Sequence, residues 1–204
     1  MTAAAREFDA MPSPASKRFT FRTALRRFRR NGRGSAAVEF ALVAPMFFAL
    51  LFAIIETALM FFASQVLETI TQNSARVVLT GQAQSGSVAA CAVSGVGTPC
   101  TQGTFKAYVC TQIPALFDCN SLYVDVQSYS NSFASVTLSS HIDASNNFVA
   151  TGMQYNPGSA GQVVVVRMYY QWPLFVTGLG YNIANLNGNK RLLVATAAFQ
   201  NEPY

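Results

Sequence analysis

The chain has 204 residues, of which 51% are hydrophobic and 11% are charged, and its formal net charge is +5. A typical soluble domain carries about 25% charged residues, so this composition is a poor fit for an ordinary cytosolic enzyme. The charge is also uneven: residues 1–34 sum to +7, whereas residues 35–204 sum to −2. This asymmetry disfavours a chain-wide nucleic-acid binder, and the single histidine, His141, excludes a site that needs two imidazoles.

The basic segment at residues 1–34 reads as a cytoplasmic leader. Phenylalanines are interleaved with its arginines, a pattern that could also bind nucleic acid. An apolar stretch follows directly, so attraction to anionic lipid is the simpler account. We therefore expect no nucleic-acid partner.

An uncharged run from Phe40 to Ile55 predicts a membrane span. After Glu56, apolar residues continue to Phe62, and residues 40–62 as a helix would be about 35 Å long, enough to cross a hydrocarbon core of about 30 Å. A buried core helix is disfavoured because a domain of this size rarely hides a helix that is apolar on every face. A cleaved secretory signal is disfavoured by the length of the run and the lack of an obvious A-x-A site.

The positive-inside rule places the leader in the cytoplasm and residues 64–204 on the other side of the membrane. Within the span, Pro45 is tolerated in a membrane helix, either as a simple kink or as a hinge. We expect Glu56 to snorkel toward the outer surface, with pairing to a cation of a neighbouring subunit as the alternative.

Helical spacing continues through residues 64–80, which predicts one long helix over residues 36–80 with Gly81 as its C-cap. Residues 81–104 are rich in small and polar residues and are predicted to form a loop. A second short helix is expected from Phe105 to Phe117, capped by Thr101 or Thr104 and weakened by Pro114.

Four segments have the composition of β-strands: residues 122–128, 133–139, 163–170 and 192–199. The predicted fold class is α+β, a long N-terminal helix packed on a small antiparallel sheet. The predicted domains are the leader at residues 1–34, the helix at residues 35–80, and an extracytoplasmic head at residues 81–204.

Four cysteines lie close together in the head: Cys91, Cys100, Cys110 and Cys119. The two outer gaps are both C-x8-C, longer than the two- to four-residue spacers of zinc sites, and no C-x-x-C redox motif is present. Disulfides are expected in an oxidising compartment. Three connectivities are open, and we prefer Cys91 with Cys100 and Cys110 with Cys119.

The sequence gives no sign of catalysis. It lacks the nucleophile-elbow, P-loop, zincin and dinucleotide-binding motifs, and Asp118, Asp125 and Asp143 show no spacing of a carboxylate pair. His141 stands alone in a polar loop and is read as a surface or hydrogen-bonded residue. We expect no enzyme activity, no cofactor and no metal.

The region after the leader, GRGSAAVEFALVAPMFF, resembles the processing signal of type IV pilins, with Gly34 followed by Ser35, Glu39 and Phe40. In this form it looks like the TadE/TadG family of pseudopilins of the tight-adherence (Flp, type IVb) pilus system. The ending AFQNEPY at residues 198–204 resembles the FRNEP ending of TadE-like proteins, with Gln200 where arginine is usual.

The resemblance implies that a membrane-embedded prepilin peptidase cleaves between Gly34 and Ser35. Glu39 would then be the fifth residue of the processed chain, where a pilin glutamate is thought to pair with the free amine of a neighbouring subunit. The implied partners are the peptidase, other pilins or pseudopilins, the inner-membrane assembly platform and the lipid bilayer.

The implied function is that of a minor pseudopilin in the assembly of adhesive Flp pili, held in the bacterial inner membrane with a periplasmic head. After processing, it could enter the fibre, prime it, or remain at the platform. The competing hypothesis is an uncleaved single-pass membrane protein whose periplasmic module binds a ligand or acts as an enzyme.

Overall fold

The computed structural model describes residues 34–88, 91, 97–113, 116–130 and 132–204. The leader, except for Gly34, lies outside the described residues, as does Pro114. Internal contacts divide the chain into two units, residues 1–47 and 48–204. The fold class is confirmed as α+β, with a long apolar helix and a three-stranded antiparallel sheet.

The longest element of the described residues is helix α2, which spans Ser35–Leu79 and contains Pro45. It matches the predicted range within one residue. The helix ends at Gly81, whose φ of 73° lies in the left-handed region and whose amide donates to the carbonyl of Val78. Glycine adopts this conformation without the steric cost of a Cβ atom. A short helix, α3 (Gln82–Ser85), follows directly.

Helix α4 (Gln102–Gln112) begins at Thr101, which forms a capping box with Thr104. The predicted helix reached Phe117, which was too long. Ile113 is already extended, with φ −77° and ψ 130°, because a residue that precedes proline is disfavoured in the α region.

The sheet has the order β1-β2-β3, with strands β1 (Leu122–Tyr129), β2 (Val163–Pro173) and β3 (Lys190–Gln200). Both pairs are antiparallel; Leu122 lies opposite Tyr170, and Val163 lies opposite both Tyr129 and Gln200. Three of the four predicted strands are therefore confirmed. Short 3-10 turns lie at Cys119–Ser121 (η2), Phe133–Ser135 (η3) and Val176–Leu179 (η4) within the described part of the chain.

The strand predicted at residues 133–139 was wrong, because this segment contains the turn η3 instead. Its serines use their hydroxyls locally: the side chain of Ser132 accepts from the amide of Ala134, and that of Ser135 donates to the carbonyl of Ser132. Such short-range bonds compete with strand pairing.

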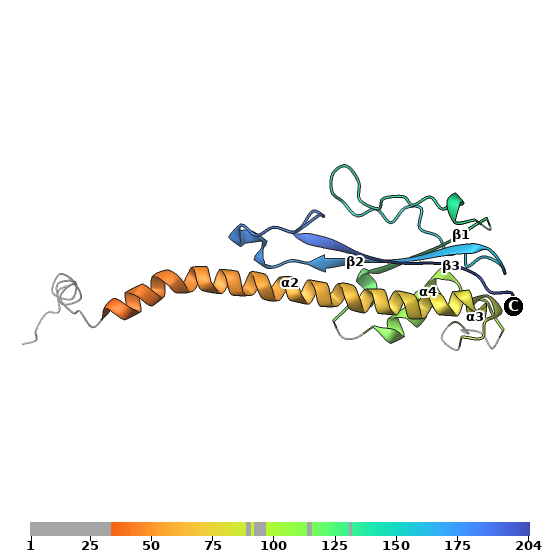
Figure 1. The fold of residues 1–204 in the computed structure, drawn as a ribbon, viewed down its shortest axis with the longest axis horizontal. Coiled ribbons are helices and arrows are strands. Elements are labelled where there is room, and N and C mark those ends of the chain that lie inside the picture. The colour runs from red at the N-terminus through yellow and green to blue at the C-terminus, as the bar shows by residue number, and fades with distance from the viewer. Residues whose placement is uncertain (1–33, 89–90, 92–96, 114–115, 131) are drawn as a thin grey trace, which may run out of the picture. The chain divides into compact units, whose positions relative to one another are not determined.

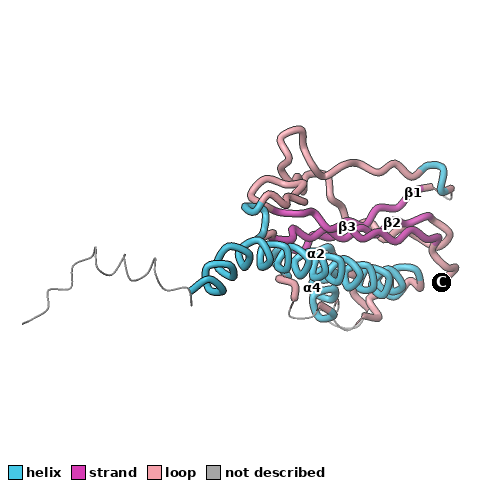
Figure 2. The backbone as a smooth tube through the Cα atoms, turned by 60° about the vertical axis from the view of Figure 1, so that its left-hand side comes forward, coloured by secondary structure: helices cyan, strands magenta, loops and turns pink. Residues whose placement is uncertain are grey.

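Within residues 48–204, the sheet has a different cover on each face. Helices α2 and α4 lie against one face and the long connection between β1 and β2 lies over the other (Figures 1 and 2). The α2-side core unites the helix with alternate strand positions: Met60, Ala63, Leu67, Ile70, Val78, Val124, Val126, Val166, Met168 and Ala195. The far-side core is smaller, with Tyr169, Leu186 and Leu192 at its centre and Ile142, Phe148 and Met153 against them. Strand β2 is consequently buried on both faces, which explains its continuous run of valines.

Candidate functional site

The predicted processing and assembly residues lie at the start of α2. Ser35 is the first residue of the helix, and Ser35 and Glu39 are both exposed. Residues four apart share one side of a helix, so Glu39 lies one turn from Ser35 on the same side. Phe40 is 67% exposed, and no atom within 4 Å would meet a Cβ added at Gly34. Among the described residues the ion pair found is Arg167 with Asp125, so Glu39 has no ion-pair partner there.

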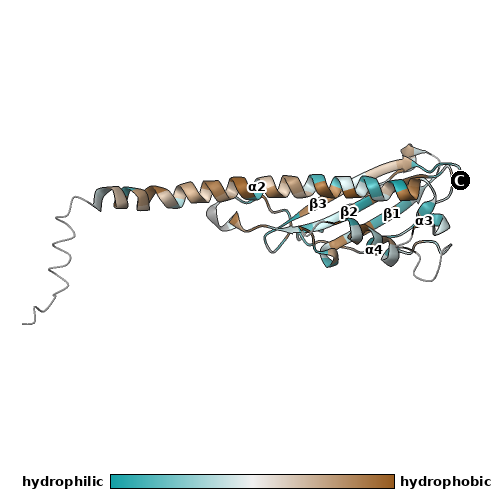
Figure 3. Cartoon of the chain, turned by 90° about the horizontal axis from the view of Figure 1, so that it is seen from below, coloured by the Kyte–Doolittle hydropathy of each residue, from teal (hydrophilic) through white to brown (hydrophobic). Residues whose placement is uncertain are grey.

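Helix α2 is long and apolar enough to cross a membrane, and none of its most apolar 18-residue window is buried. Figure 3 shows the predominantly hydrophobic colouring of its N-terminal part. Large apolar side chains at least 44% exposed follow one another along the helix: Val38, Phe40, Leu42, Val43, Met46, Phe47, Phe48, Leu50, Phe52, Ile54, Ile55, Leu59, Phe61 and Phe62. This surface makes α2 a candidate membrane anchor.

Glu56 is not turned outward, so the expectation that it snorkels was wrong, and its pairing with a cation of a neighbouring subunit stays a prediction. Its side chain is 7% exposed, and its carboxylate accepts hydrogen bonds from the backbone amides of Phe175 and Val176. The two distances from Val176 N are 3.3 Å to Oε1 and 3.2 Å to Oε2. These amides begin the turn η4, so a carboxylate here meets backbone donors that lack an intrahelical partner. Glu56 therefore ties the anchor helix to the β2–β3 connection.

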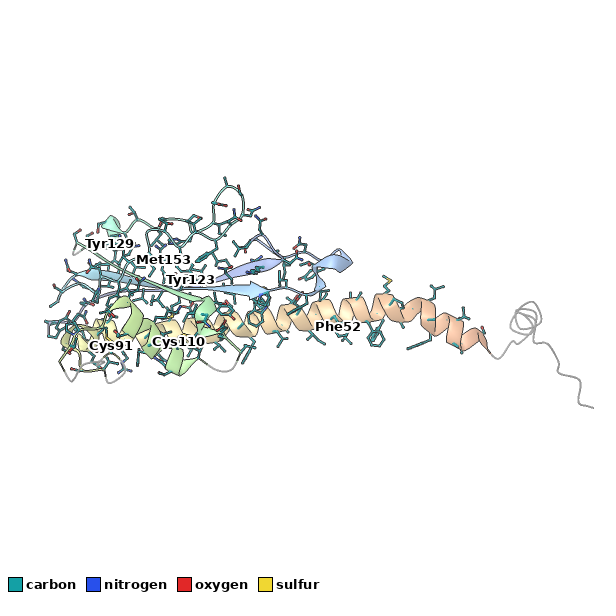
Figure 4. All side chains as sticks on the ribbon, turned by 180° about the vertical axis from the view of Figure 1, so that it is seen from behind. Phe52, Cys91, Cys110, Tyr123, Tyr129 and Met153 are labelled. Carbon is teal, nitrogen blue, oxygen red and sulfur yellow. A yellow bond between two sulfur atoms is a disulfide. The ribbon has the colours of Figure 1, made fainter. Side chains whose placement is uncertain are left out.

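The four cysteines form two disulfides, Cys91–Cys100 and Cys110–Cys119, which is the pairing preferred from the sequence. Their Cα atoms are 4.9 Å and 5.7 Å apart, respectively. The second bond joins the C-terminal part of α4 to the turn η2 before β1. Figure 4 shows Cys91 and Cys110 on the α2 side of the sheet.

A buried ion pair was missed by the sequence analysis. Asp125 and Arg167 lie opposite each other on β1 and β2, with Arg167 Nη2 2.7 Å from Asp125 Oδ2. Asp125 Oδ1 also accepts from the amide of Gln154, and Arg167 Nη1 donates to the carbonyl of Ser139. The pair thus fastens the β1–β2 connection onto the sheet. On β1 Asp125 alternates with Val124 and Val126 and so lies on the face opposite the helix, but the local pattern does not indicate that this face is covered.

His141 is buried against Tyr169 of the far-side core, so the prediction of a surface residue was wrong and that of a hydrogen-bonded residue is confirmed. Its Nδ1 lies 2.9 Å from the carbonyl oxygen of Val149, and its ring meets that of Tyr169 edge-on with centroids 4.8 Å apart. Burial raises the pKa of Tyr169 to about 12. On the surface nearby, the backbone amide of Asn147 lowers the pKa of Asp143 by hydrogen bonding to its carboxylate.

No group of three or more His, Cys, Asp or Glu side chains is arranged to hold a metal within the described part of the chain. Asp118 and Asp143 each bond to their own local turns, Asp118 to the amide of Asn120 and Asp143 to those of Ser145 and Asn147. Asp125 is occupied by Arg167. The three aspartates are therefore used structurally and do not converge on a cleft.

Comparison with known proteins gives one family match. Residues 34–76 match the family described as TadE-like protein, which confirms the resemblance over the start of α2 and most of its length. TadE-like proteins belong to Tad pilus systems as assembly components and are not known as enzymes. No curated protein and no solved structure matches the chain. The likeness of residues 198–204 to a TadE-like ending lies outside the matched segment and stays a prediction.

Proposed function

We propose, from the TadE-like segment at residues 34–76, that this chain is a minor pseudopilin processed after Gly34 and used in the assembly of adhesive Tad pili. The observation that carries the proposal is the exposed apolar helix that begins at Ser35, directly after a basic leader, with Glu39 exposed one turn later. An assembly subunit needs an anchor to hold it in the membrane and a free polar group for its neighbours. The exposed apolar surface of α2 and the exposed carboxylate of Glu39 support these two requirements.

Cleavage between Gly34 and Ser35 has a simple steric basis. Glycine lacks a Cβ atom, so the chain can extend into a narrow protease cleft at this point. The +7 leader would hold this junction at the anionic cytoplasmic face of the membrane, where a membrane-embedded peptidase can reach it. The head then lies in the periplasm, an oxidising compartment in which the two disulfides persist.

Glu39 is proposed to act in subunit docking. After cleavage, Ser35 carries a free α-amine, and an amine of one subunit can pair with the Glu39 carboxylate of the next. In a medium of low dielectric constant an isolated carboxylate is costly unless it is paired. The pairing would therefore favour one axial register between neighbouring helices.

N-terminal sequencing of the protein purified from membranes of cells with an active prepilin peptidase tests the processing step. We expect the chain to begin at Ser35. An intact leader in these cells would contradict the proposal and favour an uncleaved single-pass protein.

The docking step is tested separately by Glu39→Ala, with Glu68→Ala on the same helix as the matched control. We expect Glu39→Ala to reduce pilus number and co-purification with other pilins, and Glu68→Ala to leave both unchanged. Equal effects of the two variants on pilus number and co-purification would contradict the docking role of Glu39 without affecting the proposed processing step.

A further inference from the structure

The β2–β3 connection, residues 174–189, places an unusually exposed aromatic side chain beside the anchor helix. Phe175 is 84% exposed, the largest value among the exposed large hydrophobic side chains of the described residues. It directly precedes η4 and is held next to α2 by the bond between its amide and Glu56. This bond holds the backbone of Phe175 beside α2.

Phe175 forms one wall of an apolar groove of about 390 Å³. Helix α2 contributes Phe52, Ile55 and Leu59 to this groove, and the head contributes Trp172 and Val176. The only charged lining residue is Glu56, and its oxygens already accept hydrogen bonds from backbone amides. The groove therefore offers apolar surface with no unpaired charge.

The groove is continuous with the membrane-anchor surface. Its helical wall belongs to the exposed apolar series that α2 presents within residues 48–204, which includes Leu50, Ile54 and Phe61. By sequence length alone, residues 38–55 would be about 27 Å long as a helix. This length approaches the thickness of the hydrocarbon core, and the exposed apolar series ends at Phe62. Glu56 and Phe175 therefore fall in the outer part of the span, close to the headgroups.

The amino-acid composition of the β2–β3 connection suits a position close to the headgroups. Residues 171–189 contain no charged side chain. Tyr181 is 40% exposed and its hydroxyl lies 3.1 Å from that of Thr57, so the connection that carries Phe175 also holds an exposed amphipathic aromatic side chain beside α2. Such side chains are enriched at membrane interfaces. Lys190 and Arg191, next along the chain, lie opposite Pro173 and Trp172 and can attract anionic headgroups.

We propose that the β2–β3 connection is a second membrane contact, in which Phe175 inserts at the boundary between acyl chains and headgroups and a lipid chain fills the groove beside α2. The head then rests on the bilayer in a fixed orientation about the anchor. The proposal depends on α2 being a membrane anchor, and it is independent of cleavage or pilus assembly.

The test places one environment-sensitive fluorophore on the full chain in vesicles of phosphatidylcholine and phosphatidylglycerol. The four native cysteines are disulfide-bonded, so Phe175→Cys offers a single thiol for labelling. Phe52→Cys on the anchor is the positive control. Phe133→Cys is the negative control, because Phe133 is 55% exposed but follows the end of β1 that pairs with Val163, remote from the groove.

Quenching by lipids that carry a spin label near the headgroup should be at least about threefold greater at position 175 than at 133. Equal, weak quenching at positions 175 and 133 would overturn the proposal. Quenching at position 175 that appears only at high protein-to-lipid ratios would also overturn it, because it would indicate contact with a second copy of the chain. Absence of quenching at position 52 would overturn both the anchor and the second contact.

An unlabelled variant provides a second readout. Trp172 is the only tryptophan in the chain, and its quenching by brominated lipids should fall in Phe175→Asp but not in Phe133→Asp. Glu56→Leu removes the acceptor for the Phe175 and Val176 amides and should also reduce the quenching of Trp172. Glu56→Gln retains one acceptor oxygen and should reduce the quenching less. Unchanged quenching in Phe175→Asp would contradict the proposal.

Discussion

Asp125 and Arg167 show how single residues hold the far side of the head together. Both side chains are at most 5% exposed, and their remaining polar atoms bond to the backbone and to Gln127. A buried ion pair gains little over a well-packed apolar pair, but it is costly to break from one side only. The geometry therefore makes each of the two residues dependent on the other.

We expect Asp125→Ala to lower the free energy of unfolding by about 3–5 kcal/mol, because it leaves the guanidinium of Arg167 buried without a counter-charge. Asp143→Ala is the matched control, since that aspartate is exposed and bonds only within its own turn. Urea denaturation of the detergent-solubilised protein measures both variants. Similar losses in both would show that the buried ion pair contributes no more to stability than the hydrogen bonds of an exposed turn.

At the scale of elements, the two disulfides provide an internal comparison. Each closes a loop with a sequence separation of 9, so loop-closure entropy alone predicts the same contribution from each, about 2.7 kcal/mol. Their surroundings differ, because Cys91 and Cys100 are buried while Cys110 and Cys119 are half-buried. The contribution of side-chain packing to stability should therefore differ between the two disulfides.

Replacing both cysteines of one bond by alanine should lower the free energy of unfolding by about 2–4 kcal/mol. We expect the larger loss for Cys91 and Cys100, whose side chains also belong to the α2-side core. Denaturation of the two double variants under the same conditions shows which one loses more of the free energy of unfolding. A larger loss of stability for the Cys110 and Cys119 variant would contradict this ranking. It would show that the covalent link between α4 and β1 contributes more than the packing of Cys91 and Cys100 in the core.

The helices and strands also show how much of the fold could be predicted from the sequence. Apolar patterns located α2, α4 and three strands. The N-terminal part of α2 and strand β2 are continuous apolar runs, α4 has helical spacing, and β1 alternates, with Val124 and Val126 in the core. The turn at Phe133–Ser135 escaped because its serines bond locally. The contacts of Glu56 and Asp125 escaped because their partners lie 119 and 42 residues away. Local patterns contain no information about such pairs.

At the scale of the whole molecule, the net charge of +5 belongs to a precursor in the proposed pathway. Cleavage after Gly34 would remove the +7 leader and leave side chains that sum to −2. Retention in the membrane must then come from the apolar surface of α2, since the basic leader is gone. Electrostatic attraction is screened by salt, whereas burial of apolar surface is not.

We therefore expect both the precursor and the chain that begins at Ser35 to stay in the membrane fraction in alkaline carbonate and in high salt, and to be released by detergent. Immunoblotting of the fractions checks this. A processed chain released by carbonate or salt would show that the leader, rather than α2, holds the protein at the membrane.

The central position of β2 has a consequence for the order in which the head is completed. Synthesis runs from α2 toward β3, so β2 pairs first with β1 and remains an edge strand until residues 190–200 emerge. During that interval its valine-rich edge exposes unpaired amides and carbonyls, the kind of surface that recruits other chains. The nascent head is thus most vulnerable to aggregation just before its last strand arrives, and a chaperone that shields β2 would act in that interval.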